Sequence, residues 1–241
     1  MKQRLDQVLV ERGLVSSRSQ AESFIKLGHV QVNKKEVTKP GFAVQASDDV
    51  TLRAGEQYVS RAGLKLASVA DRLKLDFENK IVLDVGSSTG GFTDYALRHG
   101  AAKVIAVDVG TDQLHPSLHT DKRIELHEKT DIRDIKANEI DTPDIVVADV
   151  SFISLRDILP GVFILSSMQT VVVAMAKPQF EAGHSALKHK GVIKNDAMRR
   201  HILKDFEQWL QQQAVIIDKA DSKIAGAKGN LERFYLLRKL R

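Results

Sequence analysis

A short stretch of the sequence combines an acidic residue with a glycine-rich turn. Residues 81–92 read Ile-Val-Leu-Asp-Val-Gly-Ser-Ser-Thr-Gly-Gly-Phe, in which an apolar run reaches Asp84 and breaks at Gly86 before a helical pattern begins. This order predicts a strand, a tight loop and a helix N-terminus. In α/β proteins a ligand commonly lies where such a loop opens at the carboxyl end of a strand, facing backbone N–H groups and the helix dipole.

The glycine spacing and the acids indicate which ligand suits this loop. A dinucleotide loop reads G-x-G-x-x-G, whereas the glycines here are Gly86, Gly90 and Gly91, and the Asp84 carboxylate would repel a pyrophosphate. S-adenosylmethionine fits better, because it carries a cationic amino group and a sulfonium but no phosphate. A second acid, Asp108, ends the next predicted strand about twenty residues past the turn, where a ribose diol is usually bound. We therefore expect a nucleoside cofactor.

Three more polar residues fall at strand ends or in turns beside strands. Asp149 ends a predicted strand at 144–149, Lys177 follows an almost wholly apolar strand at 170–176, and Glu232 lies at the entry to the last strand. Carboxyl ends of parallel strands meet at one edge of a sheet. These side chains are thus expected on the same rim as the glycine-rich loop.

Alternating strands and helices must position these residues. Strands are predicted at 81–85, 103–108, 123–127, 144–149, 170–176, 215–217 and 234–237, and helices at 92–99, 155–167 and from Asn195 or Asp196 to Trp209. A further helix with Leu64, Ala67, Leu73 and Leu75 as apolar positions precedes them. The pattern predicts an α/β domain with a parallel, doubly wound, Rossmann-like sheet. Residues 181–194 form a long loop with Lys188, Lys190 and Lys194, a candidate substrate loop.

The first fifty residues show a different pattern. Arg4–Arg12 is predicted to be a helix that ends at Gly13, and Ser16 or Ser17 should cap a second helix that ends at Gly28. Short strands at 29–33 and within 42–52 follow, and residues 53–56 read as a polar linker. We expect a small α+β domain at residues 1–55 and the α/β domain at residues 56–241.

Composition excludes several classes of protein. The chain has 241 residues, a net charge of +5 and no cysteine, so disulfides, iron–sulfur clusters and thiolate nucleophiles are absent. Residues 1–40 carry eight Lys or Arg against four acids, and residues 219–241 carry seven against two, which favours a polyanion partner approached from two sides. No apolar run approaches the ~20 residues of a membrane span and no signal-peptide core follows the first residues, so we expect a cytoplasmic protein.

The N-terminal segment resembles a known RNA-binding motif. Arg4-Leu-Asp6, Ser17-Arg-Ser-Gln-Ala21, Gly28-His-Val30 and Val32-Asn33 are similar to the αL motif of a small-subunit ribosomal protein, tyrosyl-tRNA synthetases and pseudouridine synthases. Joined to the glycine-rich loop, the layout is similar over the whole chain to the TlyA or hemolysin-A family of ribosomal RNA 2′-O-methyltransferases, whose catalytic domain is FtsJ-like. The resemblance implies ribosomal RNA or a ribosomal subunit as the partner, and a cytidine ribose, in large-subunit RNA, as the target.

The resemblance also implies roles for individual residues. Lys65, Asp149, Lys177 and Glu232 match the family's catalytic tetrad, with Lys177 as the base, Asp149 orienting it, and Lys65 and Glu232 positioning the ribose. The expected cofactor site comprises Asp84, Gly86, Ser87, Ser88, Gly90, Phe92, Asp108, Asp131, Ile132 and Asp149, with Asp131 and Ile132 at the adenine. The expected RNA-binding residues are Arg4, Arg18, Lys26, Lys34, Lys35, Lys188 and Lys190.

Several alternative functions fit the sequence less well than RNA 2′-O-methylation. A non-catalytic RNA-binding ribosome-assembly factor would not need an intact tetrad, and a membrane-active hemolysin would need an apolar or strongly amphipathic segment. An NAD-linked oxidoreductase conflicts with the glycine spacing and Asp84, and base N-methylation with the absence of an Asn/Asp-Pro-Pro-aromatic turn. His115, His127 and His184 have no metal-ligand spacing, so we expect no metal, and we expect a monomer.

Overall fold

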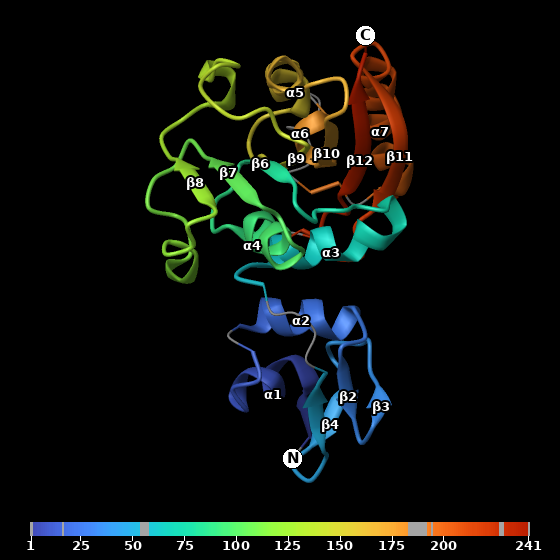
Figure 1. The fold of residues 1–241 in the computed structure, drawn as a ribbon. Helices are drawn as coiled ribbons and strands as arrows, with labels where there is room; N and C mark the ends of the chain where they lie inside the picture. The colour runs from blue at the N-terminus through green and yellow to red at the C-terminus, as the bar shows by residue number, and fades with distance from the viewer. Residues whose placement is uncertain are drawn as a thin grey trace.

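The computed structural model describes residues 2–15, 17–53, 58–182, 192–193, 195–226 and 229–240. A small N-terminal domain of helices and short strands precedes a larger α/β domain (Figure 1). The predicted boundary near residue 55 falls within residues 54–57, outside the described part of the chain.

The small domain packs two helices against short strands. Its elements are β1 (Lys2–Arg4), α1 (Leu5–Glu11), α2 (Arg18–Lys26), β2 (Val30–Val32), β3 (Lys35–Glu36), β4 (Ala43–Gln45) and β5 (Val50–Leu52). Ser17 caps α2 by accepting the Gln20 backbone N–H, as predicted. The prediction of a helix from Arg4 is wrong at its start, because Lys2–Arg4 pair with β4 as an antiparallel strand and the helix begins at Leu5.

The large domain is built on one seven-stranded sheet. Its strands are β6 (Ile81–Val85), β7 (Lys103–Val107), β8 (Ile124–His127), β9 (Ile145–Ala148), β10 (Val171–Ala176), β11 (Ala214–Asp221) and β12 (Arg233–Lys239), in the spatial order β11-β12-β10-β9-β6-β7-β8. The doubly wound α/β prediction is confirmed. A wholly parallel sheet is wrong, because β12 runs antiparallel to both β10 and β11. The described part of the connection from β11 to β12, residues 222–226 and 229–232, contains no crossover helix, and such a connection produces antiparallel neighbours.

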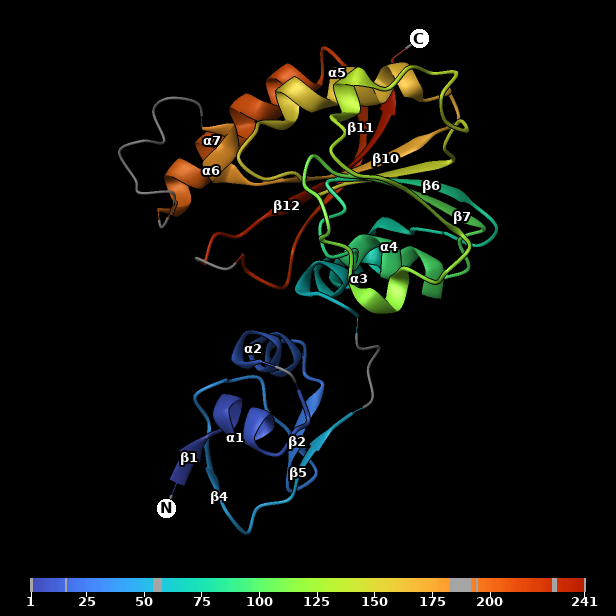
Figure 2. The same cartoon turned by 90° about the vertical axis from the view of Figure 1, so that its left-hand side faces the viewer.

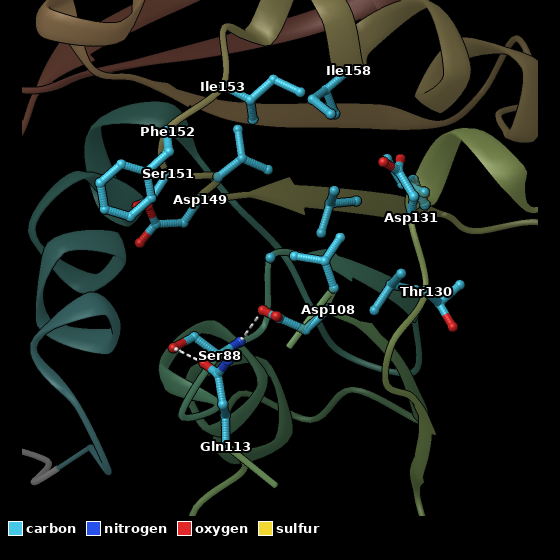
Figure 3. Close-up of a pocket in the computed structure, with 16 residues that line it drawn as sticks. Ser88, Asp108, Gln113, Thr130, Asp131, Asp149, Ser151, Phe152, Ile153 and Ile158 are labelled. Carbon is cyan, nitrogen blue, oxygen red and sulfur yellow. Dashed lines mark hydrogen bonds between the residues drawn. The ribbon is translucent and has the colours of Figure 1, made fainter. Parts of the chain in front are cut away.

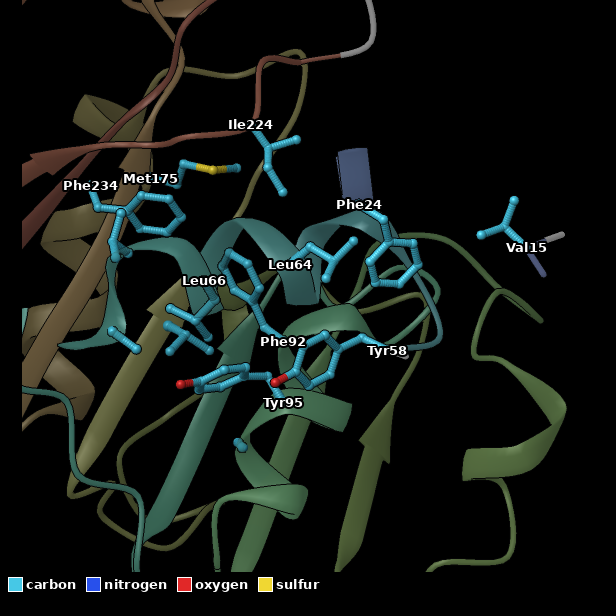
Figure 4. Close-up of a cluster of buried hydrophobic side chains, with 14 of the residues drawn as sticks. Val15, Phe24, Tyr58, Leu64, Leu66, Phe92, Tyr95, Met175, Ile224 and Phe234 are labelled. Carbon is cyan, nitrogen blue, oxygen red and sulfur yellow. The ribbon is translucent and has the colours of Figure 1, made fainter. Parts of the chain in front are cut away.

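Helices cover both faces of the sheet. Figure 2 shows α3 (Arg61–Leu73) and α4 (Gly91–Arg98) on one face, and α5 (Leu155–Leu165) and α7 (Asp196–Leu210) on the other. Successive strand residues face opposite sides, so Val82 packs in the cluster with α3 and α4 and Leu83 in the cluster with α5 and α7. Figure 4 shows Leu64 and Leu66 of α3 beside Phe92 of α4 in the first cluster. Burial on both faces explains why the strands read as continuous apolar runs.

Side-chain caps set the starts of the helices. Ser60, Ser154 and Asn195 accept backbone N–H groups at the N-termini of α3, α5 and α7, and Asn195 was one of the two caps predicted for α7. A short helix, α6 (Pro178–Glu181), starts directly after β10. Two 3-10 helices, η1 (Pro116–Leu118) and η2 (Ile132–Asp134), lie in stretches for which no helix or strand was predicted.

The strand order creates a crevice between β6 and its neighbours. β6 pairs with β7 on one side and with β9 on the other, so the chain leaves β6 and β9 in opposite directions across the sheet. Ligands of doubly wound proteins bind at the carboxyl ends of the strands at such a point.

The small domain meets the large one through its second helix: α2 contacts α3.

Candidate cofactor and catalytic site

A cavity of about 460 Å³ opens at the carboxyl ends of β6, β7 and β9 (Figure 3). Asp149, Ser151 and Phe152 gather at one end of it, and Thr130 and Asp131 lie at the other. This volume falls within the ~300–1,000 Å³ of typical small-molecule sites. The crevice predicted from the glycine-rich loop therefore exists and can enclose a nucleoside.

Asp84 is the buried acid of this site. Its side chain is 1% exposed and accepts a hydrogen bond of 2.6 Å from Thr93 Oγ1. Its other oxygen, Oδ1, and the buried Ser87 Oγ have no hydrogen-bond partner among the described residues. Burial raises the pKa of Asp84 to about 7, the Thr93 hydrogen bond opposes this rise, and the Asp149 carboxylate adds to it. A ligand cation would supply the donor that Oδ1 lacks.

The unpaired atoms line a second, smaller compartment of about 130 Å³. It shares four lining residues with the main cavity, Gly86, Ser88, Asp149 and Ser151, and adds Asp84, Ser87 and Phe92. The site thus consists of a larger cavity and a smaller adjoining one that contains the buried Asp84 carboxylate. That division suits a nucleoside that carries a cationic amino-acid tail.

Asp108 lies where a ribose would be bound, just after β7. Its Oδ2 accepts the Ser88 N–H at 2.8 Å and its Oδ1 accepts the Gly110 N–H at 2.7 Å (Figure 3). Each carboxylate oxygen keeps a second lone pair, so both can still accept from the hydroxyls of a diol.

Two predicted glycines shape the loop in different ways. Gly86 has a φ of +80°, and a Cβ there would lie 2.9 Å from the Asp149 carbonyl oxygen, so glycine allows the loop to approach the end of β9. Gly90 has a φ of +86°, and a Cβ there would lie 2.5 Å from Leu118 Cδ1. Gly90 lines neither compartment and packs against η1, which makes it a structural support.

Asp131 and Ile132 line the far end of the main cavity. Asp131 accepts the Arg133 backbone N–H at 2.9 Å and pairs with its guanidinium at 2.6 Å. Hydrogen bonding to that guanidinium lowers the pKa of Asp131, so the carboxylate is ionised and fixed. With the buried Ile132 side chain beside it, this end offers an acceptor and an apolar wall to a flat ring.

Two buried ion pairs bring the predicted tetrad together. Lys177 Nζ lies 2.6 Å from Asp149 Oδ1 and donates to Ser151 Oγ at 2.7 Å. Lys65 Nζ lies 2.5 Å from Glu232 Oε2. Each lysine is 8% exposed, which is rare for this residue type unless it is paired.

The two ion pairs form one electrostatic cluster. Burial raises the pKa of Glu232, Lys65 opposes this rise, and the charges of Asp149 and Lys177 also act on it. Two arginines hold the loop that carries Glu232: Arg61 donates to the Ala225 carbonyl at 2.6 Å and Arg199 to the Leu231 carbonyl at 2.9 Å. The reach of Glu232 into the site thus depends on contacts from α3 and α7.

Phe152 is a site residue to which the sequence analysis gave no role. It is 93% exposed, has a φ of +67° and lies at the Asp149 end of the cavity (Figure 3). Its ring centroid is 5.5 Å from that of Phe180, and Lys177 Nζ lies 5.9 Å from the Phe180 centroid. The only available signal was its place three residues after Asp149.

The predicted RNA-binding arginines of the small domain share one buried partner. Arg4 donates to Asp6 at 3.0 and 2.9 Å, and Arg18 donates to the same carboxylate at 2.9 Å. Both arginine side chains remain about half exposed while Asp6 is buried. The structure therefore brings Arg4 and Arg18 together, through an acid that the sequence analysis did not single out as a site residue.

The predicted RNA-binding lysines lie on different elements. Lys26 is exposed on the last turn of α2, and Lys34 and Lys35 are exposed at the turn between β2 and β3. Lys188 and Lys190 lie outside the described residues.

The described residues contain no candidate metal cluster and no candidate membrane helix. In the described ranges no group of three or more His, Cys, Asp or Glu residues could hold a metal ion. His115 contacts Ser117, and His127 lies 2.5 Å from Glu125, while His184 falls outside those ranges. Within the same part of the chain, no helix has both the length and the apolar composition for crossing a bilayer.

Comparison with known proteins identifies both domains. Residues 58–239 match the model of the FtsJ-like methyltransferase family, and residues 3–50 match the S4 domain. Over 232 residues the chain is 38% identical to hemolysin A of Brachyspira hyodysenteriae, covering 95% of this chain and 97% of that protein.

Two further relatives have named reactions. The 16S/23S rRNA (cytidine-2′-O)-methyltransferase TlyA of Mycobacterium tuberculosis is 36% identical over 98% of this chain and 89% of its own length. The 23S rRNA (cytidine-2′-O)-methyltransferase TlyA of Campylobacter jejuni is 40% identical over 75% of this chain and 70% of its own length.

Proposed function

The chain belongs to the FtsJ-like methyltransferase family, and from this premise we propose that it transfers a methyl group to the 2′-oxygen of a cytidine in ribosomal RNA. The observation that carries the proposal is the pair of buried ion pairs, Lys177 with Asp149 and Lys65 with Glu232, beside a nucleoside-sized cavity. Large-subunit RNA is the proposed substrate, because both relatives with named reactions act on 23S rRNA.

The residues of the cavity fit S-adenosylmethionine. That cofactor, when bound, supplies a methyl group on a sulfonium that an attacking oxygen can displace. The unpaired oxygens of Asp84 and Ser87 would hold its amino group, and Asp108 would accept from its ribose hydroxyls. Asp131 and Ile132 would hold the adenine.

Lys177 is the proposed general base. The pKa of a ribose 2′-hydroxyl lies far above 7, so the proton must leave as the oxygen attacks. When Lys177 Nζ is neutral, its two N–H groups can donate to Asp149 and Ser151, and its lone pair can take the proton from the 2′-oxygen. The resulting ammonium is balanced by the Asp149 carboxylate, 2.6 Å away.

Lys65 and Glu232 are proposed to orient the ribose. Their direct ion pair limits the net charge of the buried site, and Lys65 keeps N–H groups that can donate to ribose oxygens. Because Glu232 also interacts electrostatically with Asp149 and Lys177, loss of Lys65 would change the charge around the base as well as the positioning of the substrate.

Phe152 is proposed as the contact for the target base. Phe152 leaves an aromatic ring that is 93% exposed in water and holds its backbone at a positive φ. Neither cost is offset by burial of the ring, which is typical of a functional site. A nucleobase taken out of its stack recovers a few kcal/mol by stacking on such a ring. Phe180 beside it extends the apolar surface.

The small domain is proposed to dock the RNA. Its exposed Lys34 and Lys35, together with Arg4 and Arg18, supply the positive charge that phosphate contacts need, and residues 3–50 match the S4 domain. Because the proposed substrate belongs to the ribosome, we propose that the protein acts in the cytoplasm, as a monomer.

Methylation of isolated subunits tests the function. Purified protein would be incubated with large subunits, small subunits or free ribosomal RNA from cells that lack it, with S-adenosylmethionine labelled in the methyl group. We expect 2′-O-methylcytidine in large-subunit RNA by mass spectrometry of nucleosides. Label on a base, or no label in any RNA, would contradict the proposal.

A further inference from the structure

The loop from Asp149 to Leu155 is held at two places by the segment that follows β10. At its start, Lys177 Nζ donates to Ser151 Oγ at 2.7 Å. At its end, Glu181 accepts from Ser154 Oγ at 2.5 Å and from the Leu155 N–H at 2.9 Å. Phe152 lies between the two attachments, so its position is set by both.

Glu181 is a buried acid that the proposed reaction does not use. Its side chain is 6% exposed, and burial raises its pKa while the Ser154 hydrogen bond opposes this rise. Burying a carboxylate is unfavourable unless its hydrogen bonds compensate. A serine or threonine cap alone can start a helix, and Ser154 already caps α5 by accepting the Arg156 N–H. Glu181 therefore does more than start that helix.

The backbone of Phe152 needs such an attachment. Its φ of +67° lies in the left-handed region, which side chains with a Cβ rarely adopt unless the surroundings fix it. The Phe152 ring lies against Phe180, with 5.5 Å between the centroids. The backbone is restrained on both sides of Phe152 by hydrogen bonds, one from Lys177 to Ser151 and two that Glu181 accepts from Ser154 and Leu155.

We propose that Glu181 is a positioning residue that fixes the Ser151–Leu155 segment and thereby sets where Phe152 presents the target nucleotide. The inference rests on the proposed function, because it assumes that Phe152 contacts the base. Among the described residues the Glu181 side chain bonds to Ser154 and Leu155 and to no side chain of the tetrad, and its backbone N–H donates to the Lys177 carbonyl at 3.2 Å. Its effect should therefore appear in the use of RNA more than in the chemistry.

Steady-state methylation of large subunits by the full-length protein tests this inference. Glu181→Ala should raise KM for the RNA substrate by about tenfold, the loss that a buried charged hydrogen bond commonly causes, with a smaller fall in kcat. Glu181→Gln should restore most of the loss, since its amide can accept from Leu155 and donate to Ser154. Phe152→Ala should raise KM in the same way.

A double-mutant cycle separates positioning from general destabilisation. In the Phe152→Ala background, Glu181→Ala should add little, because both changes act through one contact. Thr170→Val is the matched control: Thr170 Oγ1 is buried and donates to the Pro143 carbonyl at the opposite end of β10, so this variant should lose stability without raising KM.

Two results would overturn the inference. One is full additivity of Glu181→Ala and Phe152→Ala in kcat/KM, and the other is an unchanged KM in Glu181→Ala. Either can be recognised only if the wild-type protein methylates RNA, so failure of the proposed function would show first, as absence of product in the wild-type reaction.

Discussion

Asp84 links the protonation state of the site to cofactor binding. Burial raises its pKa to about 7, so the empty site favours the neutral acid below that pH. Because the folded pKa exceeds the usual value of 3.8, Asp84 contributes stability that is complete below pH ~4 and is lost as the pH rises through 7. A bound cation reverses this preference and favours the carboxylate.

The first prediction is that S-adenosylmethionine binds more tightly at pH 7.5 than at pH 5.5. If the bound cation keeps Asp84 ionised throughout, the dissociation constant should rise by roughly 20-fold at the lower pH. Isothermal titration calorimetry at both values measures this. Asp84→Asn should bind weakly at both, and a wild-type affinity independent of pH would argue against an Asp84 contact with the amino group.

The second prediction concerns the proposed base. Lys177→Ala should lower kcat by ~10²-fold or more, because assistance in removing the 2′-hydroxyl proton disappears, while the affinity for S-adenosylmethionine should change little. Lys177→Arg is the matched control, since it keeps the charge beside Asp149 but cannot deprotonate, and it should be nearly as inactive. An active arginine variant would show that charge, and not proton transfer, is what the reaction needs.

At the residue scale the sequence indicated the charged groups of the site, but it did not indicate the residues that hold the neighbouring loop or contact the substrate. Asp84, Asp108, Asp149 and Lys177 stand at strand ends, and periodicity alone brings strand ends to one edge of a sheet. The roles of Lys65 and Glu232 came from the family resemblance. No local pattern marks an exposed phenylalanine as functional or a glutamate as a partner for a loop 26 residues away, so contacts between distant segments had to be seen.

At the element scale, apolar runs predicted where the strands of the large domain lie. They did not predict the direction in which each strand runs. Burial on both faces gives a signal within five or six residues, which is why β6, β7 and β10 were predicted within a residue or two. The reversal of β12 and the pairing of β1 with β4 depend on partners more than thirty residues away in the chain. Such pairings leave no local trace.

The third prediction concerns the loop between β6 and α4. Gly86→Ala should destabilise the protein by about 1–3 kcal/mol, since the new Cβ meets the Asp149 carbonyl at a strained φ, and it should weaken cofactor binding. Thermal unfolding with and without S-adenosylmethionine measures both effects. Gly13→Ala is the control, because Gly13 also has a positive φ but a Cβ there meets nothing within 4 Å. Equal losses in the two variants would mean that backbone strain, and not the close approach to β9, explains Gly86.

At the scale of the whole molecule the two domains divide the work. The residues proposed for the cofactor lie between Asp84 and Asp149, and the tetrad between Lys65 and Glu232, so both belong to the large domain. The small domain contributes charge at Lys34, Lys35 and the arginine pair. It also leaves a crevice against α3, lined on one side by Leu27 and His29 and on the other by Leu64 and Ala67.

The last prediction is that deletion of residues 1–52 preserves cofactor binding and abolishes methylation of ribosomal subunits. The truncated protein keeps the whole seven-stranded sheet, and it exposes Leu64 and Ala67, so it should lose some stability but still bind S-adenosylmethionine by calorimetry. The matched point variant is Lys35→Gln, which should weaken RNA binding and lower its salt dependence by about one phosphate contact. Arg18 is a poorer choice, because Arg18→Glu would place a second carboxylate against the buried Asp6. If the truncated protein methylates subunits at the wild-type rate, the RNA is held by the large domain and the small domain has another task.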